Sequence, residues 1–340
     1  LSVGYVPSPM TIFNEVREVP SGVVLRFDEG LIPLTTQYWS LPKEKKVRLD
    51  QSDVVGQIDE LLNDAVSLRL RADVPVGVFL SGGIDSGLIT AIAAQKSTEP
   101  IRTFSATFEN SSFDESSLAR QVANKYGTEH HELKLTPKLD ELLPAVAGAY
   151  DEPFADPSAV PTYAIAREAA RHVKVVLNGE GSDEMFGGYR RHQAMNYYSK
   201  LSPIINCVPE MVWQRFHKLL PMPRRFRSKY AFLYRFLRAF GTTTVERYLS
   251  WGSDIFSAKE KSLLGVFEAQ QTTEEYLAGQ YESMLDLDPT SHFMRLDFLS
   301  GMSDCLLVKI DMATMAHGLE GRSPFLDHRL VELAWRLPHS

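Results

Sequence analysis

Short apolar runs alternate with amphipathic stretches through the first half of the chain. A helical pattern begins near Gln51 and places apolar residues from Val54 to Val66 on one face. The runs that follow predict strands at Val76–Leu80, Arg102–Phe108, His130–Leu135 and Val173–Leu177, and helices near Ser86–Gln95, Glu115–Tyr126, Lys138–Tyr150 and Pro161–Arg171. Strands that alternate with helices in this way predict a twisted parallel sheet with helices on both faces.

The pattern changes on both sides of this segment. Val23 to Tyr38 predicts two strands joined through Asp28-Glu29-Gly30, where the glycine can supply a positive φ. After Met185 strand patterns largely vanish, and helices are predicted at Tyr230–Phe240, Val245–Trp251, Tyr276–Met284, Phe293–Ala316 and Leu330–Leu337. We therefore predict a short β segment over residues 1–45, a nucleotide-binding α/β part over 46–190 and a mainly helical part over 191–340.

Composition narrows the classes of function. The 340 residues are 44% hydrophobic and 23% charged, with a formal net charge of -7, so neither nucleic acid nor an anionic membrane is an expected partner. Cys207 and Cys305 stand far apart, which favours neither a disulfide framework nor a zinc site. No apolar run reaches the ~18–20 residues of a transmembrane helix, and we expect a cytoplasmic protein that acts on small molecules.

The stretch SGGIDS, from Ser81 to Ser86, follows a predicted buried strand. Gly82 and Gly83 allow the backbone to turn closely around an anion, and the next helix points its positive end at the same place. The lysine of a Walker A loop is missing, and Asp85 would repel phosphate unless a cation such as Mg²⁺ lay between them. The alternative is an ordinary strand-to-helix turn, with Asp85 stabilised by the helix dipole.

A second stretch, VKVVLNGEGSDEMFGGY from Val173 to Tyr189, repeats this design and adds Glu180, Asp183 and Glu184. The carboxyl ends of parallel strands lie at the same edge of a sheet, and ligands bind there where the strand order reverses. We therefore predict that Asp85 and Asp183 hold one magnesium ion together. The alternative, an acidic loop in solvent, does not explain the glycines that flank these acids.

Five motifs, in this order, carry a family resemblance: SGGIDS, SSFDESSLAR, DEPFADPSAVPTY, NGEGSDEMFGGY and LVKIDMATMAHGLEGRSPFLDHRLVELAW. Together they resemble the synthetase half of the glutamine-dependent asparagine synthetases, within the ATP pyrophosphatase group and its adenine nucleotide alpha hydrolase-like fold. The resemblance implies that ATP is cleaved between its α- and β-phosphates, that a carboxylate acceptor such as the aspartate side chain is adenylated, and that ammonia from glutamine then forms the amide.

The resemblance also implies roles for single residues. Residues that would contact the nucleotide and its pyrophosphate are Phe79, Leu80, Ser81, Gly82, Gly83, Asp85, Ser86, Ala106, Asn178 and Gly179. Asp85 and Asp183 would bind Mg²⁺. Glu180 matches the glutamate implicated in forming the acyl-adenylate and handling the amine, as a general base or a cation anchor.

Two departures from the family leave questions open. The best-studied asparagine synthetases carry a threonine-threonine-isoleucine-arginine run, whose arginine helps bind the acceptor's carboxylate, where this chain has about Ala155-Asp156-Pro157. The acceptor could therefore be aspartate, a sugar, a peptide or a β-lactam precursor, and a nucleotide-binding module without chemistry is the alternative from another class. The family's glutaminase domain uses an N-terminal cysteine nucleophile, and neither cysteine of this chain is near a terminus. We therefore expect a missing N-terminal glutaminase portion and truncation at both ends, with a homodimer as one expected assembly.

Three weaker patterns are interpreted as structural. Met222 to Phe240 interleaves arginines with aromatics, and a helix hairpin with an aromatic core is favoured over an RNA or membrane surface. His130 and His131 are expected to pack or cap a strand. Glu320, Arg322 and Asp327 are expected to form an ion-pair network that braces the floor of the active site, with direct substrate contact as the alternative.

Overall fold

The computed structural model describes residues 2–29, 32–42, 50–108, 114–135, 139–224, 228–252, 256, 261, 263–264, 272–282 and 287–338. The chain separates into two compact units. The α/β unit contains residues 6–186 and 300–338, and the helical unit contains residues 2–5 and 187–299. The domain boundaries predicted near residues 45 and 190 remain a prediction. No helix in the described ranges is long and apolar enough to cross a membrane.

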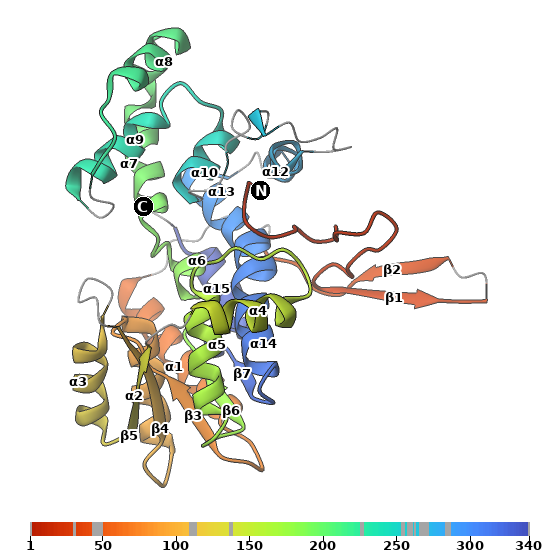
Figure 1. The fold of residues 1–340 in the computed structure, drawn as a ribbon, viewed down its shortest axis with the longest axis vertical. Coiled ribbons are helices and arrows are strands. Elements are labelled where there is room, and N and C mark those ends of the chain that lie inside the picture. The colour runs from red at the N-terminus through yellow and green to blue at the C-terminus, as the bar shows by residue number, and fades with distance from the viewer. Residues whose placement is uncertain are drawn as a thin grey trace. The chain divides into compact units, whose positions relative to one another are not determined.

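A five-stranded parallel sheet forms the centre of the α/β unit, in the order β5-β4-β3-β6-β7 (Figure 1). Its strands are β3 (Val76–Phe79), β4 (Arg102–Phe108), β5 (Glu129–Leu135), β6 (Val175–Leu177) and β7 (Glu320–Arg322). The first four confirm the strands predicted from apolar runs. The order reverses between β3 and β6, so the loops that leave these two neighbours open a crevice at the carboxyl edge.

Helices cover both faces of this sheet, as predicted. α2 (Ile84–Lys96) and α3 (Ser116–Tyr126) pack on one face beside α1 (Gln51–Arg69), and α5 (Ala159–Ala169) packs on β4 and β5 with α14 (Leu307–Met315) and α4 (Leu139–Tyr150). On the α5 face the core contains Phe104, Ala166, Ala169, Val173, Val176 and Leu319, and on the α3 side Leu80, Ala119 and Ala123 pack together. Alternate residues of the strands thus point to opposite faces of the sheet and contribute to an apolar core on each face.

The N-terminal hairpin is present, with β1 (Val23–Phe27) antiparallel to β2 (Pro33–Gln37). Gly30 of its predicted turn lies outside the described residues. Trp39, just after the hairpin, donates its indole N–H to Glu332 of α15 (His328–Arg336) at 3.1 Å. The end of the hairpin segment is therefore tied to the last helix of the same unit.

The helical unit contains α7 (Arg190–Ile205), α8 (Glu210–Leu219), α9 (Lys229–Arg238), α10 (Thr244–Gly252), α12 (Thr273–Glu282) and α13 (Pro289–Leu296). Its core is rich in aromatic residues and includes Tyr198, Phe240, Tyr248 and Phe293. Among the described aromatic residues between Met222 and Phe240, Tyr234 and Phe240 are buried, Phe232 and Phe236 are half-buried and Tyr230 is exposed. The helix-hairpin interpretation with an aromatic core therefore holds for part of the segment, and residues 225–227 lie outside the described ranges. Asp297 is buried beneath these helices and accepts hydrogen bonds from Arg191, His192 and Tyr248 at 2.6–2.7 Å.

The long helix predicted over Phe293–Ala316 is interrupted in its middle. α13 is followed by a π-helical stretch, η1 (Asp297–Leu306), and only then by α14. Periodicity alone could not show the change, because a π-helix keeps the chain helical while it shifts the register of side chains. α6 (Ser182–Phe186), α7 and α8 were not predicted.

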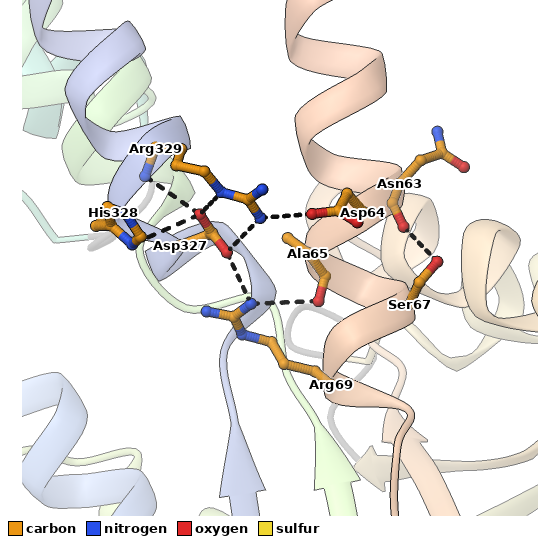
Figure 2. Close-up of polar contacts among 8 residues, drawn as sticks. All are labelled: Asn63, Asp64, Ala65, Ser67, Arg69, Asp327, His328 and Arg329. Carbon is orange, nitrogen blue, oxygen red and sulfur yellow. Dashed lines mark hydrogen bonds and ion pairs between the residues drawn. The ribbon is translucent and has the colours of Figure 1, made fainter.

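Ion pairs fix the segment from β7 to α15 against α1 (Figure 2). Arg322 pairs with Glu320 at 2.7 Å and donates to the carbonyl oxygens of Arg69 and Arg71. Asp327 is 5% exposed and accepts from Arg69 and Arg329, and Arg329 also reaches Asp64 of α1 at 2.6 Å. All three predicted residues form ion pairs, but in two separate groups, because Asp327 pairs with Arg69 and Arg329 and not with Arg322. That these pairs brace the floor of the active site remains a prediction.

Candidate active site

A pocket of about 360 Å³ lies at the carboxyl edge of the sheet, where β3, β4 and β6 end, and its size is typical of small-molecule sites. It is lined by Phe79, Leu80, Ser81, Gly82, Gly83, Asp85, Ser86, Phe104, Ser105, Ala106, Glu115, Ser116, Ala119, Thr162, Ile165, Asn178, Gly179, Glu180 and Ile310. Every residue predicted to contact the nucleotide is in this lining, and so is Glu180. Two motifs separated by about ninety residues of sequence thus meet at the switch point of the sheet.

Two serines shape the SGGIDS loop. The hydroxyl of Ser86 accepts from the amide of Ser81 at 3.0 Å, and the hydroxyl of Ser81 accepts from the amide of Gly83 at 3.1 Å. The two hydroxyls are 2.8 Å apart. α2 begins directly after Gly83, so its first-turn amides have no partners within the helix, and Gly83, Asp85 and Ser86 of this helix end line the pocket. The loop is therefore held by its own serines and presents a positive helix end.

Glycines bring neighbouring segments into contact at the pocket. A Cβ on Gly179 would lie 3.1 Å from the amide nitrogen of Ser86 and 3.3 Å from Cβ of Asp85, so the loops after β6 and β3 touch at this point. A Cβ on Gly82 would lie 2.8 Å from Cβ of Glu115. Any side chain at either position would fill space beside the loop that the sequence predicts to hold pyrophosphate.

The loop after β6 places its acids in different surroundings. Asn178 is 4% exposed, and its Oδ1 accepts from the amide of Glu180 at 3.1 Å and from the hydroxyl of Ser323 at 2.7 Å. Glu184 is 1% exposed, so the alternative of an acidic loop in solvent is wrong for this residue. Asp183 lies in the first turn of α6, but it is not among the residues that line the pocket. Its predicted role as a magnesium ligand remains a prediction.

The charge of the lining bears on what it can bind. Its ionisable side chains in the described chain are Asp85, Glu115 and Glu180, all acidic. A polyphosphate in such a pocket needs a divalent cation to offset the repulsion, and Mg²⁺ is commonly held by one or two carboxylates together with phosphate oxygens. The donor set therefore fits a magnesium nucleotide with Asp85 as a ligand, and when bound the ion would neutralise charge on the phosphates.

A buried lysine stands behind Glu180. The Nζ atom of Lys309 is 3.4 Å from Oε1 of Glu180 and 3.8 Å from Oδ2 of Asp156, and its side chain is 8% exposed. The thiol of Cys305 lies 3.8 Å from the same oxygen of Asp156. Burial, and then Asp156, raise the pKa of this thiol to about 12, so Cys305 is a neutral neighbour. The sequence motif contained Lys309, but sequence reasoning assigned it no role.

The histidines and cysteines have structural surroundings. His131 stacks on Phe104, with ring centroids 5.2 Å apart, and a ring nitrogen of His130 is 2.9 Å from the hydroxyl of Thr103. Within the described ranges no three histidine, cysteine or acidic side chains are grouped to hold a metal. Cys207 and Cys305 are both free thiols. These contacts agree with the packing role predicted for His130 and His131.

The model of the asparagine synthase family matches residues 57–340, which contain the whole pocket. The chain belongs to the asparagine synthase family. Its similarity to an asparagine synthetase (glutamine-hydrolyzing) of Bacillus subtilis is 30% identity over 99% of this chain and 52% of that protein. A Mycobacterium tuberculosis protein with the provisional name asparagine synthetase (glutamine-hydrolyzing) is 35% identical over 98% of this chain and 50% of its own length.

One further relative carries a different name. A Penicillium rubens protein named amidase chyE is 24% identical over 97% of this chain and 53% of that protein. The chain thus spans about half the length of the curated relatives it matches. The residues matched by the asparagine synthase family model include both glycine-containing motifs, which the pocket brings together. The lining residues Glu115, Thr162, Ile165 and Ile310 were not predicted as part of the site.

Proposed function

We propose that the chain is the ATP-dependent amide-forming part of a carbon-nitrogen ligase of the asparagine synthetase type. In this reaction the α-phosphorus of ATP is attacked by a carboxylate of the acceptor, pyrophosphate leaves, and ammonia then displaces AMP from the acyl-adenylate to give the amide. The observation that supports it is the single pocket in which SGGIDS and the Asn178-Gly179-Glu180 segment meet at the sheet's switch point.

The residues of the pocket have distinct proposed tasks. The amides at the start of α2, with the hydroxyls of Ser81 and Ser86, stabilise the departing pyrophosphate, and Asp85 with Asp183 holds Mg²⁺ beside it. Phe79, Leu80 and Ala106 contact the nucleoside largely through their backbones. Since pyrophosphate is the leaving group, the site has no need of the lysine with which Walker A loops reach the γ-phosphate.

Glu180 is the proposed catalytic residue. It is the acidic side chain of the lining that comes from the β6 loop, and its Oε1 lies 3.4 Å from a buried ammonium. A carboxylate there can accept a proton from the attacking amine or hold an ammonium ion near the acyl carbon. Loss of the charge should therefore strongly slow product formation without loss of the nucleotide site.

Aspartate is the first acceptor to test, with ammonia supplied from glutamine by a preceding domain, and residues 1–45 are proposed as the end of that domain. The second candidate is a related ligase with another acceptor. The segment around Asp156 favours this alternative. The resemblance places the arginine for the acceptor's carboxylate in this segment, and here it contains an acid 3.8 Å from Lys309 and no arginine. A cytoplasmic location and a homodimer belong to the same proposal.

Acceptor-dependent release of pyrophosphate tests this function. Purified protein is incubated with ATP, Mg²⁺ and ammonium chloride, without acceptor and with aspartate, amino sugars or peptide carboxylates. Release with aspartate supports asparagine synthesis, and release only with another acceptor supports the second candidate. If the protein binds ATP but no acceptor produces pyrophosphate, the chain is a nucleotide-binding module and the proposal is wrong.

A further inference from the structure

Lys309 is a buried cation behind Glu180 of the pocket lining, and the proposed reaction does not yet use it. It lies in α14 with its side chain 8% exposed, and lysines are rarely buried so far unless their charge is matched. Its ammonium is 3.4 Å from Glu180, which lines the pocket, and 3.8 Å from Asp156, which does not. Lys309 thus connects the candidate catalytic carboxylate to a second acid behind it.

The two carboxylates are held in different ways. Oδ1 of Asp156 accepts from both the amide and the hydroxyl of Ser158, each at 2.7 Å, so this acid is anchored at the start of α5 whether or not Lys309 is present. The carboxylate of Glu180 has Lys309 as its ion-pair partner in the described chain. Its backbone amide donates to Asn178, so Lys309 is the described charged group placed to orient its side chain.

Lys309 is itself fixed from the neighbouring helix. The hydroxyl of Tyr150 in α4 donates to the carbonyl oxygen of Lys309 at 2.9 Å, and Tyr150 stacks on Phe154 with centroids 4.5 Å apart. Burial, and then the charge of Asp156, raise the pKa of Tyr150, so its hydroxyl remains a donor. With Tyr150 and Cys305 both neutral, the Lys309 ammonium is the cation that offsets Asp156 and Glu180.

We propose that Lys309 is a positioning residue, which holds the Glu180 carboxylate at the pocket wall with Asp156 as its anchor. The proposal rests on the amide-forming function proposed above. In the reaction it would keep Glu180 directed at the position of the incoming amine while the acyl-adenylate forms. A displacement of ~1 Å in a reacting group can lower a rate by ~100-fold, so Lys309 should influence kcat and not the binding of ATP.

A double-mutant cycle separates positioning from general structure. The variants are K309M, K309R, E180Q and K309M/E180Q, with K174M as a control, because Lys174 is exposed in the same unit. K309M should lower kcat for amide formation by about 100-fold with KM for ATP unchanged. It should cause no further loss in the E180Q background, since no carboxylate is left to position. K309R keeps the charge and should retain most activity, and K174M should match the wild type.

Two results would overturn the proposal. One is an equal fold-loss from K309M in the wild-type and E180Q backgrounds, and the other is K309R as slow as K309M. If K309M fails to fold, K309M/D156N removes one of the two unpaired carboxylates. This variant should recover stability but stay slow, and wild-type kcat in it would also refute positioning by Lys309.

The same variants can be compared by their thermal unfolding midpoints, a measurement that does not depend on activity. It therefore distinguishes failure of this proposal from failure of the proposed function. If the wild type releases no pyrophosphate with any acceptor, the function is wrong. The interaction between Lys309 and Glu180 is then tested by stability. K309M should lower the unfolding midpoint more in the wild-type background than in the E180Q background. Equal shifts in both backgrounds would show that Lys309 does not hold Glu180.

Discussion

Replacing Asp327 by asparagine removes the centre of the ion-pair network between α15 and α1 (Figure 2). Oδ1 of Asp327 accepts from the backbone amide and Nε of Arg329, and Oδ2 accepts from Arg69 and Arg329 at 3.1 Å. Burial disfavours the charge of Asp327, but these donors outweigh it and lower the pKa of Asp327 from 3.8 to about 2. The carboxylate is therefore stabilised by folding.

The magnitude follows from this pKa. A fall from 3.8 to about 2 corresponds to roughly 2 kcal/mol of folding free energy at neutral pH. Removing one partner of a fully buried pair costs about 3–5 kcal/mol, but the side chains of Arg69 and Arg329 are 24% and 39% exposed and recover hydration. We expect D327N to lower the free energy of unfolding by about 2 kcal/mol at pH 7.

Urea unfolding followed by circular dichroism, from pH 7 down to pH 3, measures this effect. Because the folded pKa is depressed, the contribution of Asp327 is complete above about pH 4 and is lost as pH falls toward 2. The gap between wild type and D327N should be constant from pH 7 to 5 and should narrow below 4. D28N is the control, since Asp28 pairs with Arg26 at an exposed position and should change little. A gap of zero at pH 7, or one that does not narrow, would refute this reasoning.

Four further substitutions test the site and the helical unit. E180Q should bind ATP as the wild type does but form little AMP, whereas wild-type turnover would remove Glu180 from the mechanism. G82A places a methyl group 2.8 Å from Cβ of Glu115, so MgATP affinity measured by calorimetry should fall roughly tenfold. D183N should raise the Mg²⁺ concentration needed for half-maximal pyrophosphate release, and an unchanged requirement would show that Asp183 is not a ligand. D297N leaves the buried partners of Asp297 unmatched and should destabilise the protein to urea by about 3–5 kcal/mol, a loss that an ordinary surface site would not show.

The sequence predicted the two central strands of the sheet from continuous apolar residues. The strands around Val78 and Val176 are almost entirely apolar, because a parallel sheet buries both of its faces. β7 was missed because Glu320-Gly321-Arg322 contains no apolar side chain. It is the edge strand of the sheet and pairs with β6. Its strand conformation depends on that pairing, which no local pattern can show.

The candidate site could be predicted as far as its two loops. Glycines and acids directly after buried strands mark Ser81 to Ser86 and Asn178 to Glu180, and the structure brings them into one lining. The remaining wall comes from helices distant in sequence. Lys309 gave one weak indication, a charged residue between Val308 and Ile310 in a helix that also carries Asp311. Its partners could be known only from the packing of α14 on α4 and α5.

The position at which ATP is cleaved tests the central claim most directly. Phosphorus NMR of a reaction with ATP, Mg²⁺, ammonia and the active acceptor distinguishes the two modes of cleavage by their products. The pocket described here predicts AMP and pyrophosphate in equal amounts, both dependent on the acceptor and both suppressed in E180Q. Formation of ADP and inorganic phosphate would contradict the assignment of the SGGIDS loop to a pyrophosphate leaving group.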